Sequence, residues 1–139
     1  MLRPPEAALL RRAVHEFNRG EYFECHETLE DLWNVLDGVP KRAVQGVLQT
    51  AVGFLHAERG NRLGAVKLLR DGIAKLEDPH APASIGLTLD GWLESVRACL
   101  ARVEVALTSG DGGNREGILS DLRVPGLPVP EGPAEESPS

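Results

Sequence analysis

The sequence predicts an all-α protein, a bundle of about five amphipathic helices built as two helical hairpins plus a closing C-terminal helix. Three observations predict this class. Apolar residues recur at three- and four-residue spacing up to about residue 109, and no stretch alternates with period two. The prolines before residue 124 fall at the start of the chain or between these periodic stretches. A weak internal repeat also pairs two of the stretches.

The first hairpin is predicted from two stretches separated by a glycine. A helix over about residues 5–17 begins at Pro5, which suits a first helical turn, and stops at Gly20. A second helix over about residues 21–36 carries an apolar seam at four- and three-residue spacing, made of Tyr22, His26, Leu29, Trp33 and Leu36.

The second hairpin and the closing helix follow the same logic. A third helix is expected over about residues 40–58, followed by Gly60, and a fourth over about 62–76, capped by Asn61. A fifth helix starts near Thr88 and keeps its apolar spacing to Leu107.

The repeat appears at an offset of 40 residues. This offset pairs Cys25 with Ala65, Leu29 with Leu69, Trp33 with Ile73, and Leu36 with Leu76. Each copy then forms the helical hairpin of tetratricopeptide-type arrays, but two copies and one helix favour a compact bundle over a solenoid.

The composition of the last 30 residues differs from that of the helical part and predicts disorder. Residues 110–139 hold 6 glycines and 5 prolines, with six acidic and two basic residues. We therefore predict a helical domain over residues 1–109 and a mostly disordered acidic tail over residues 110–139. The alternative for one short stretch, ILSDLRVPGLPVP, is that it lies on the folded body.

Charge and composition exclude some partners. The net charge is −6, of which −4 lies in residues 110–139, and no basic residues cluster on one predicted face, which argues against nucleic acid. No apolar run reaches the roughly 20 residues of a membrane span. Cys25 and Cys99 have no metal-type spacing, which indicates reduced thiols and a cytoplasmic protein. An exposed apolar strip on the fifth helix would allow a homodimer.

One polar group interrupts the seam of the second helix. At 100° per residue, Glu30 lies about 40° from His26 and Trp33 about 20° on the other side, so the three side chains share one strip. At the repeat offset, the position of His26 is filled by Val66, an ordinary apolar residue. The His26–Glu30 pair is therefore the main candidate for a functional site.

A second polar strip lies on the third helix. Gln45, Gln49, Val52 and His56 fall within an arc of about 60°. If the two strips face each other, His26, Glu30, Gln49 and His56 converge in one pocket. Two histidines and a carboxylate would suit a divalent metal such as zinc with an open coordination position. Alternatively, Glu30 orients His26 for proton transfer.

The stretches FNRGEYFECHETLEDLW, VQGVLQTAVGFLHAERGN, GAVKLL and GLTLD resemble an uncharacterised bacterial and archaeal helical family, the domain of unknown function 309, which carries an HxxxExxW/Y motif. His26, Glu30 and Trp33 match that motif, and the resemblance covers roughly residues 6–107. It implies an all-α fold and a suggested role of the motif in metal binding. It implies no reaction.

Plainer interpretations stand beside these. His26 and Glu30 can form a structural hydrogen-bonded pair, His56 can be a helix-end residue near solvent, and both tryptophans, Trp33 and Trp92, can be core anchors. The sequence has no phosphate loop, dinucleotide glycine pattern, CxxC or HExxH, so neither catalytic residues nor an enzyme activity can be assigned. The two functional hypotheses are a binding or interaction module, and a metal-binding protein, including a metal-dependent hydrolase, that uses His26 and Glu30.

Overall fold

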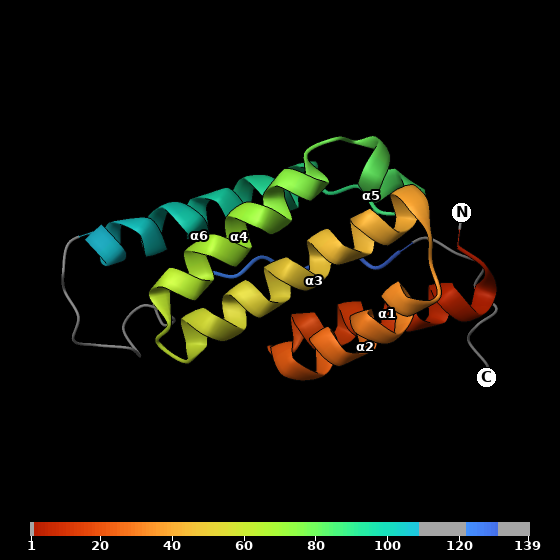
Figure 1. Ribbon diagram of the computed structural model, residues 1–139, viewed down its shortest axis with the longest axis horizontal. Coiled ribbons are helices and arrows are strands. Elements are labelled where there is room, and N and C mark those ends of the chain that lie inside the picture. Colours follow the sequence, from red (N-terminus) through yellow and green to blue (C-terminus); the bar gives the residue numbers. More distant parts are fainter. Residues whose placement is uncertain (1, 109–121, 131–139) are drawn as a thin grey trace.

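The computed structural model describes residues 2–108 and 122–130, and within them it confirms the all-α class. The helices are α1 (Pro4–Asn18), α2 (Tyr22–Asn34), α3 (Gly38–Glu58), α4 (Arg62–Leu76), α5 (His80–Ser84) and α6 (Asp90–Thr108). Figure 1 shows α1 and α2 as one antiparallel hairpin, α3 and α4 as a second, and α6 alongside α4. The described residues contain no strand.

The 40-residue repeat corresponds to two matching turns. Gly20 and Gly60 both adopt positive φ, at 77° and 81°, directly after α1 and α3. The backbone hydrogen bonds also match: the N–H groups of Gly20 and Glu21 donate to Phe17 and Glu16, and those of Gly60 and Asn61 donate to Ala57 and His56. This pair of bonds is the Schellman motif, which ends a helix at a glycine with left-handed backbone. The same turn chemistry therefore closes both hairpins.

Within the second hairpin, α3 and α4 approach closely because glycine faces the partner helix. A Cβ atom at Gly72 would lie 2.7 Å from the carbonyl oxygen of Gly46 and 3.0 Å from the backbone nitrogen of Thr50. The hydroxyl of Thr50 instead donates to the carbonyl of Gly46 at 2.9 Å, so this buried polar group is satisfied inside its own helix. Backbone-to-backbone packing of this kind sets the α3–α4 distance.

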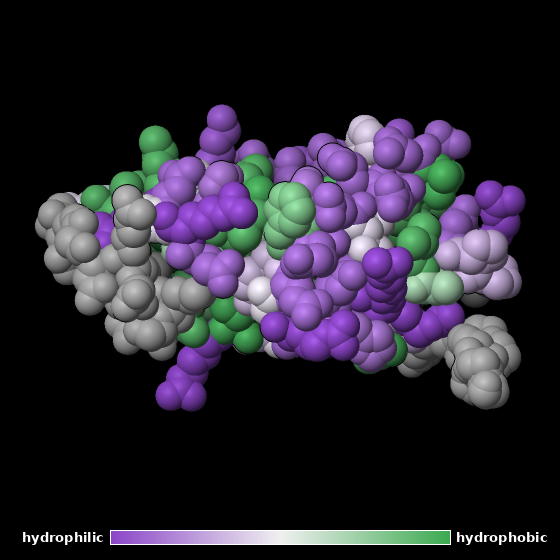
Figure 2. Space-filling view, turned by 90° about the horizontal axis from the view of Figure 1, so that it is seen from below, coloured by the Kyte–Doolittle hydropathy of each residue, from purple (hydrophilic) through white to green (hydrophobic). Residues whose placement is uncertain are grey.

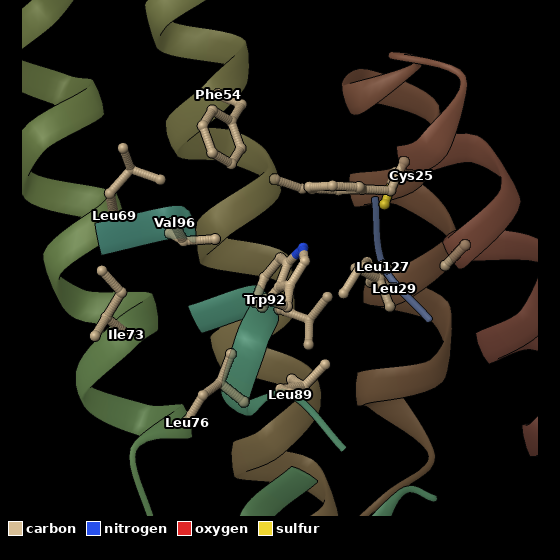
Figure 3. Packing of buried hydrophobic residues seen from close by; sticks show 14 of the residues in the cluster. Cys25, Leu29, Phe54, Leu69, Ile73, Leu76, Leu89, Trp92, Val96 and Leu127 are labelled. Carbon is tan, nitrogen blue, oxygen red and sulfur yellow. The ribbon is translucent and has the colours of Figure 1, made fainter. Parts of the chain in front are cut away.

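The core is continuous across both hairpins and α6. Phe17 lies at its centre, with ring centroids 5.3 Å from Tyr22, 6.0 Å from Phe54 and 5.9 Å from Trp92, all in edge-to-face geometry. Figure 3 shows the part of this cluster where α4, α6 and the α1–α2 hairpin meet. Trp92 is 5% exposed, which confirms its predicted role as a core anchor.

The short helix α5 is a difference from the sequence prediction, which placed no helix between residue 76 and Thr88. Pro79 stands at its N-cap and Pro82 in its first turn, where a missing N–H costs nothing because those donors have no partner within the helix. Prolines that mark a break between long helices can therefore also start a short one. His80 and His15 are exposed.

Part of the predicted tail lies on the bundle. We call residues 122–130 the strap; it is an extended segment that contacts α1 and α6, and Leu122 and Leu127 are 7% and 4% exposed. For these residues the structure agrees with the alternative prediction, that this stretch lies on the folded body, because the two leucines are buried against the core. The predicted disorder of residues 110–121 and 131–139 lies outside the described residues, and the domain boundary at residue 109 stays a prediction.

The face seen from below is mostly polar (Figure 2). Figure 2 shows one face on which hydrophilic residues dominate and apolar residues form separate patches. In the described part of the chain, no helix combines the length and apolar character needed to span a membrane.

Candidate functional site

The predicted motif residues line one groove on the surface formed by α2, α3 and α4. We call it the motif groove; its volume is about 350 Å³. Its lining residues are His26, Glu30, Trp33, Gln45, Leu48, Gln49, Val52 and Leu68. The motif strip of the second helix and the polar strip of the third helix therefore face each other, which is the condition on which the sequence-based convergence of these residues depended.

The position of the groove follows from which face α2 buries. Cys25, Leu29 and Leu32 are 0% exposed, so the buried stripe is centred on them. His26 and Trp33 flank this stripe and are only partly buried. The sequence placed both residues within the predicted apolar seam, and the observed buried stripe is rotated about the helix axis relative to that seam. The rotation puts the two side chains at the edge of the core, where they form a wall of the groove.

His26 makes few polar contacts in this position. Its Nε2 atom lies 3.8 Å from Oε2 of Glu30, beyond hydrogen-bond distance, and the two side chains are 26% and 57% exposed. The Nδ1 atom is buried and has no hydrogen-bond partner among the described residues. The ring of Phe23 is tilted against the imidazole, with 5.7 Å between centroids. The predicted hydrogen-bonded His–Glu pair is therefore a loose contact.

Trp33 shows the same pattern. Its Nε1 atom is buried without a hydrogen-bond partner among the described residues. The Lys41 ammonium lies 4.0 Å from the centroid of the indole ring, a cation–π contact that sequence reasoning missed. The side chain packs against the core from its edge. Trp33 is therefore both a partial core residue and a wall of the groove.

The wall from α3 includes the predicted Gln45, Gln49 and Val52, but His56 does not line the groove. Seven residues separate His56 from Gln49, which is about 10 Å along a helix axis. In addition, its Nδ1 atom lies 3.2 Å from the side-chain nitrogen of Asn61 in the α3–α4 turn. The expectation that His56 joins the pocket was wrong, and the alternative of a helix-end residue describes its position.

Two groove residues were missed: Leu48 and Leu68 supply apolar walls. Beside the groove, the Lys75 ammonium of α4 donates to the side-chain oxygen of Gln49 at 2.9 Å. Leu48 stands three residues after Gln45, a spacing that shares a helix face, so that residue was detectable from the sequence.

The positions of His26, Glu30 and His56 determine whether the predicted metal site can form. Among the residues that the structure describes, no group of three or more His, Cys, Asp and Glu side chains is placed to hold a metal ion. His26 and Glu30 are the two members of the predicted ligand set that come together. Protein zinc sites commonly have three or four protein ligands, so this pair alone makes a weak cation site.

Comparisons with known proteins support the predicted resemblance. Residues 10–68 match the family model described as Domain of unknown function (DUF309), which confirms the resemblance over this segment. The segment includes α2 and all eight residues that line the groove.

Two relatives are themselves uncharacterised. The uncharacterized protein YpuF of Bacillus subtilis (strain 168) is 34% identical over 88 residues, covering 60% of this chain and 49% of that protein. An uncharacterized protein of Aquifex aeolicus (strain VF5) is 25% identical over 69 residues, covering 49% of this chain and 21% of that protein. The matched region thus spans half or less of each relative. No solved structure matches the chain.

Proposed function

We propose that this chain is a small helical binding module whose ligand site is the motif groove. The ligand is a small amphipathic group, either a free molecule or the side chain of a partner protein, with an apolar body and a hydrogen-bond acceptor. The groove volume of about 350 Å³ stands at the small end of the range of ligand pockets, which fits a group of this size.

The pair of unpartnered ring nitrogens carries the proposal. Nε1 of Trp33 is a hydrogen-bond donor only, and Nδ1 of His26 is a donor in one neutral tautomer. Both atoms are buried without a partner among the described residues, and both side chains line the same groove. A buried donor without an acceptor costs about 1–3 kcal/mol, so such groups are rare unless they serve a site. Because neither nitrogen is accessible to solvent in this conformation, an acceptor on a ligand reaches them only after the rings turn toward the groove, and it would then recover this free energy.

The remaining walls define the rest of the ligand. Leu48, Val52 and Leu68 provide apolar contact area, while Glu30 supplies a negative charge at the exposed rim. A neutral acceptor such as an amide avoids repulsion by that carboxylate. We therefore expect the groove to prefer an amide on an apolar body over a carboxylate on the same body.

The test uses benzamide as the probe, with benzoate and toluene as matched comparisons. Trp33 and Trp92 supply the two indole N–H signals in a proton–nitrogen correlation spectrum, and Trp92, whose Nε1 donates to the Pro125 carbonyl at 3.2 Å, serves as the internal control. We expect benzamide to shift the Trp33 signal with a dissociation constant near ~1 mM, typical of a small fragment. Shifts that are equal for toluene and benzamide, or that spare the Trp33 signal, contradict the proposal.

Metal binding is the second candidate function, supported by the proximity of His26 and Glu30 on one helix face. It requires a further ligand, because His56 lies outside the groove. Calorimetric titration with zinc chloride, comparing the wild type with His26→Ala, separates the two functions. Zinc binding that depends on His26 supports the metal function, and heats that are equal in both proteins contradict it.

A further inference from the structure

We propose that the surface of α1 and α6 beneath the strap is a second binding site, one that accepts an extended proline-rich segment of a partner protein. The strap, residues 122–130, is its resident ligand. This site is distinct from the motif groove, since none of its residues lines that groove, and the proposal is independent of the proposed function.

The bundle holds the strap by its main chain. The side-chain amide of Asn18 donates to the carbonyl of Leu127 at 3.0 Å and accepts from the N–H of the same residue at 2.7 Å. Trp92 donates to the Pro125 carbonyl at 3.2 Å, and the Cys99 thiol donates to the Arg123 carbonyl at 3.7 Å. Side chains that bind backbone groups recognise an extended conformation, whichever side chains the bound segment carries.

Two side chains of the strap supply the specificity. Leu122 and Leu127 are buried, whereas the strap residues Arg123 and Val129 are exposed. In Figure 3 the strap passes between α6 and the α1–α2 hairpin, with Leu127 inside the apolar cluster. The site therefore recognises two leucines five positions apart.

The intervening prolines fit this mode of binding. Pro125 and Pro128 restrict the backbone to extended conformations, which reduces the entropy lost when the segment docks. This proline-rich segment with no helix of its own is held by the buried side chains of Leu122 and Leu127, by burial of its last residue, Pro130, and by the hydrogen bonds with the Asn18 amide. These are the features of a peptide in a receptor site, carried here on the same chain.

The connection to α6 makes the strap a built-in competitor. Thirteen residues separate Thr108 from Leu122 in the sequence, so docking of the strap is intramolecular and is favoured over a separate peptide of equal contacts. A partner segment of the same chemistry must displace the strap, so affinity in trans rises when the strap is weakened. We expect a gain of about tenfold or more in strap variants.

The reactivity of the Cys99 thiol reports on release of the strap. The residue is 3% exposed, and its thiol is hydrogen-bonded to the Arg123 carbonyl of the strap. The experiment uses the full chain with Cys25→Ala, which leaves Cys99 as the one thiol. The repeat already carries alanine at the matching position, Ala65, which is equally buried. Reaction of Cys99 with Ellman's reagent is measured in this background, with or without the synthetic peptide LRVPGLPVP.

Three variants of the strap contact are compared. The double substitution Leu122→Ser with Leu127→Ser removes both buried anchors, Asn18→Ala removes the amide clamp, and Val129→Ser changes an exposed position as the control. We expect the first two to raise the Cys99 reaction rate by about tenfold or more and the control to leave it unchanged. Added peptide should restore protection in the double serine variant but not in Asn18→Ala.

The outcomes separate clearly. If the double serine variant keeps its helical circular dichroism and the peptide neither slows the Cys99 reaction nor shifts any signal of the labelled protein, the proposal is overturned. If that variant unfolds, Asn18→Ala decides, because Asn18 is exposed and its loss spares the core. An unchanged Cys99 rate in Asn18→Ala would then overturn the proposal.

Discussion

The glycine contact between α3 and α4 yields a sharp prediction, that Gly72→Ala destabilises the protein although alanine is the better helix former. Gly72 lies within α4, and a Cβ atom there would lie 2.7 Å from the Gly46 carbonyl oxygen and 3.0 Å from the Thr50 nitrogen. These are backbone atoms of α3, so relief requires the helices to separate. Such overpacking costs about 1–3 kcal/mol, against a gain of about 1 kcal/mol from helix propensity.

The assay is urea unfolding followed by circular dichroism, with Ala101→Gly as the matched control. Ala101 is exposed in the middle of α6, so this reverse exchange measures helix propensity alone and should lower the free energy of unfolding by about 1 kcal/mol. We expect Gly72→Ala to lower it as well, by up to about 2 kcal/mol. If Gly72→Ala instead raises it by about 1 kcal/mol, the α3–α4 contact does not depend on glycine and the reasoning is refuted.

Three further perturbations test the fold. Burial raises the pKa of both Cys25 and Tyr22 to about 12. Because the native state then keeps protons that the unfolded chain releases, the free energy of unfolding should fall as pH rises from about 9 to 12. The fall should be less steep in Tyr22→Phe, which lacks one of the two groups. An equal slope in Tyr22→Phe would contradict this. Asn61→Ala removes the N-cap of α4 and should cost about 1 kcal/mol in urea unfolding, whereas no loss would mean that the cap is dispensable. Arg70→Ala breaks an exposed ion pair with Glu104 and should cost below about 1 kcal/mol, a larger loss indicating a structural role.

The helices were predictable because the chain carries strong local signals. The predicted ends of the first four helices fall within two residues of the observed ones. Gly20 and Gly60 end α1 and α3 through the same hydrogen bonds, and Asn61 caps α4 as expected. Capping and turn chemistry depend on residues a few positions apart, so a single sequence contains the information.

The groove was only partly predictable. Angular arithmetic placed the motif residues on one face of the second helix and Gln45, Gln49, Val52 and His56 on one face of the third, but it did not consider position along the axis, and His56 lies beyond the groove. The predicted seam also included His26 and Trp33 in the buried face, whereas they lie at its edge. The rotation of a helix about its axis is set by tertiary packing, here by the burial of Cys25 and Leu32, and local sequence does not encode it.

The strap was the largest departure. Its prolines and glycine are typical of disorder, and composition alone gave them that interpretation. What orders it is the amide of Asn18, 109 positions away, together with burial of two leucines in the core. Such long-range partners are invisible to a reading of local composition.

The central claim, that the motif groove is a ligand site completed by a hydrogen-bond acceptor, is tested most directly by the affinity of Trp33→Phe for benzamide. Phenylalanine keeps an aromatic wall but removes the buried Nε1 donor. We predict a loss of about tenfold in affinity, measured by shifts of the backbone signals around the groove, because an interaction of about 1–3 kcal/mol is removed. An affinity equal to that of the wild type would contradict the claim.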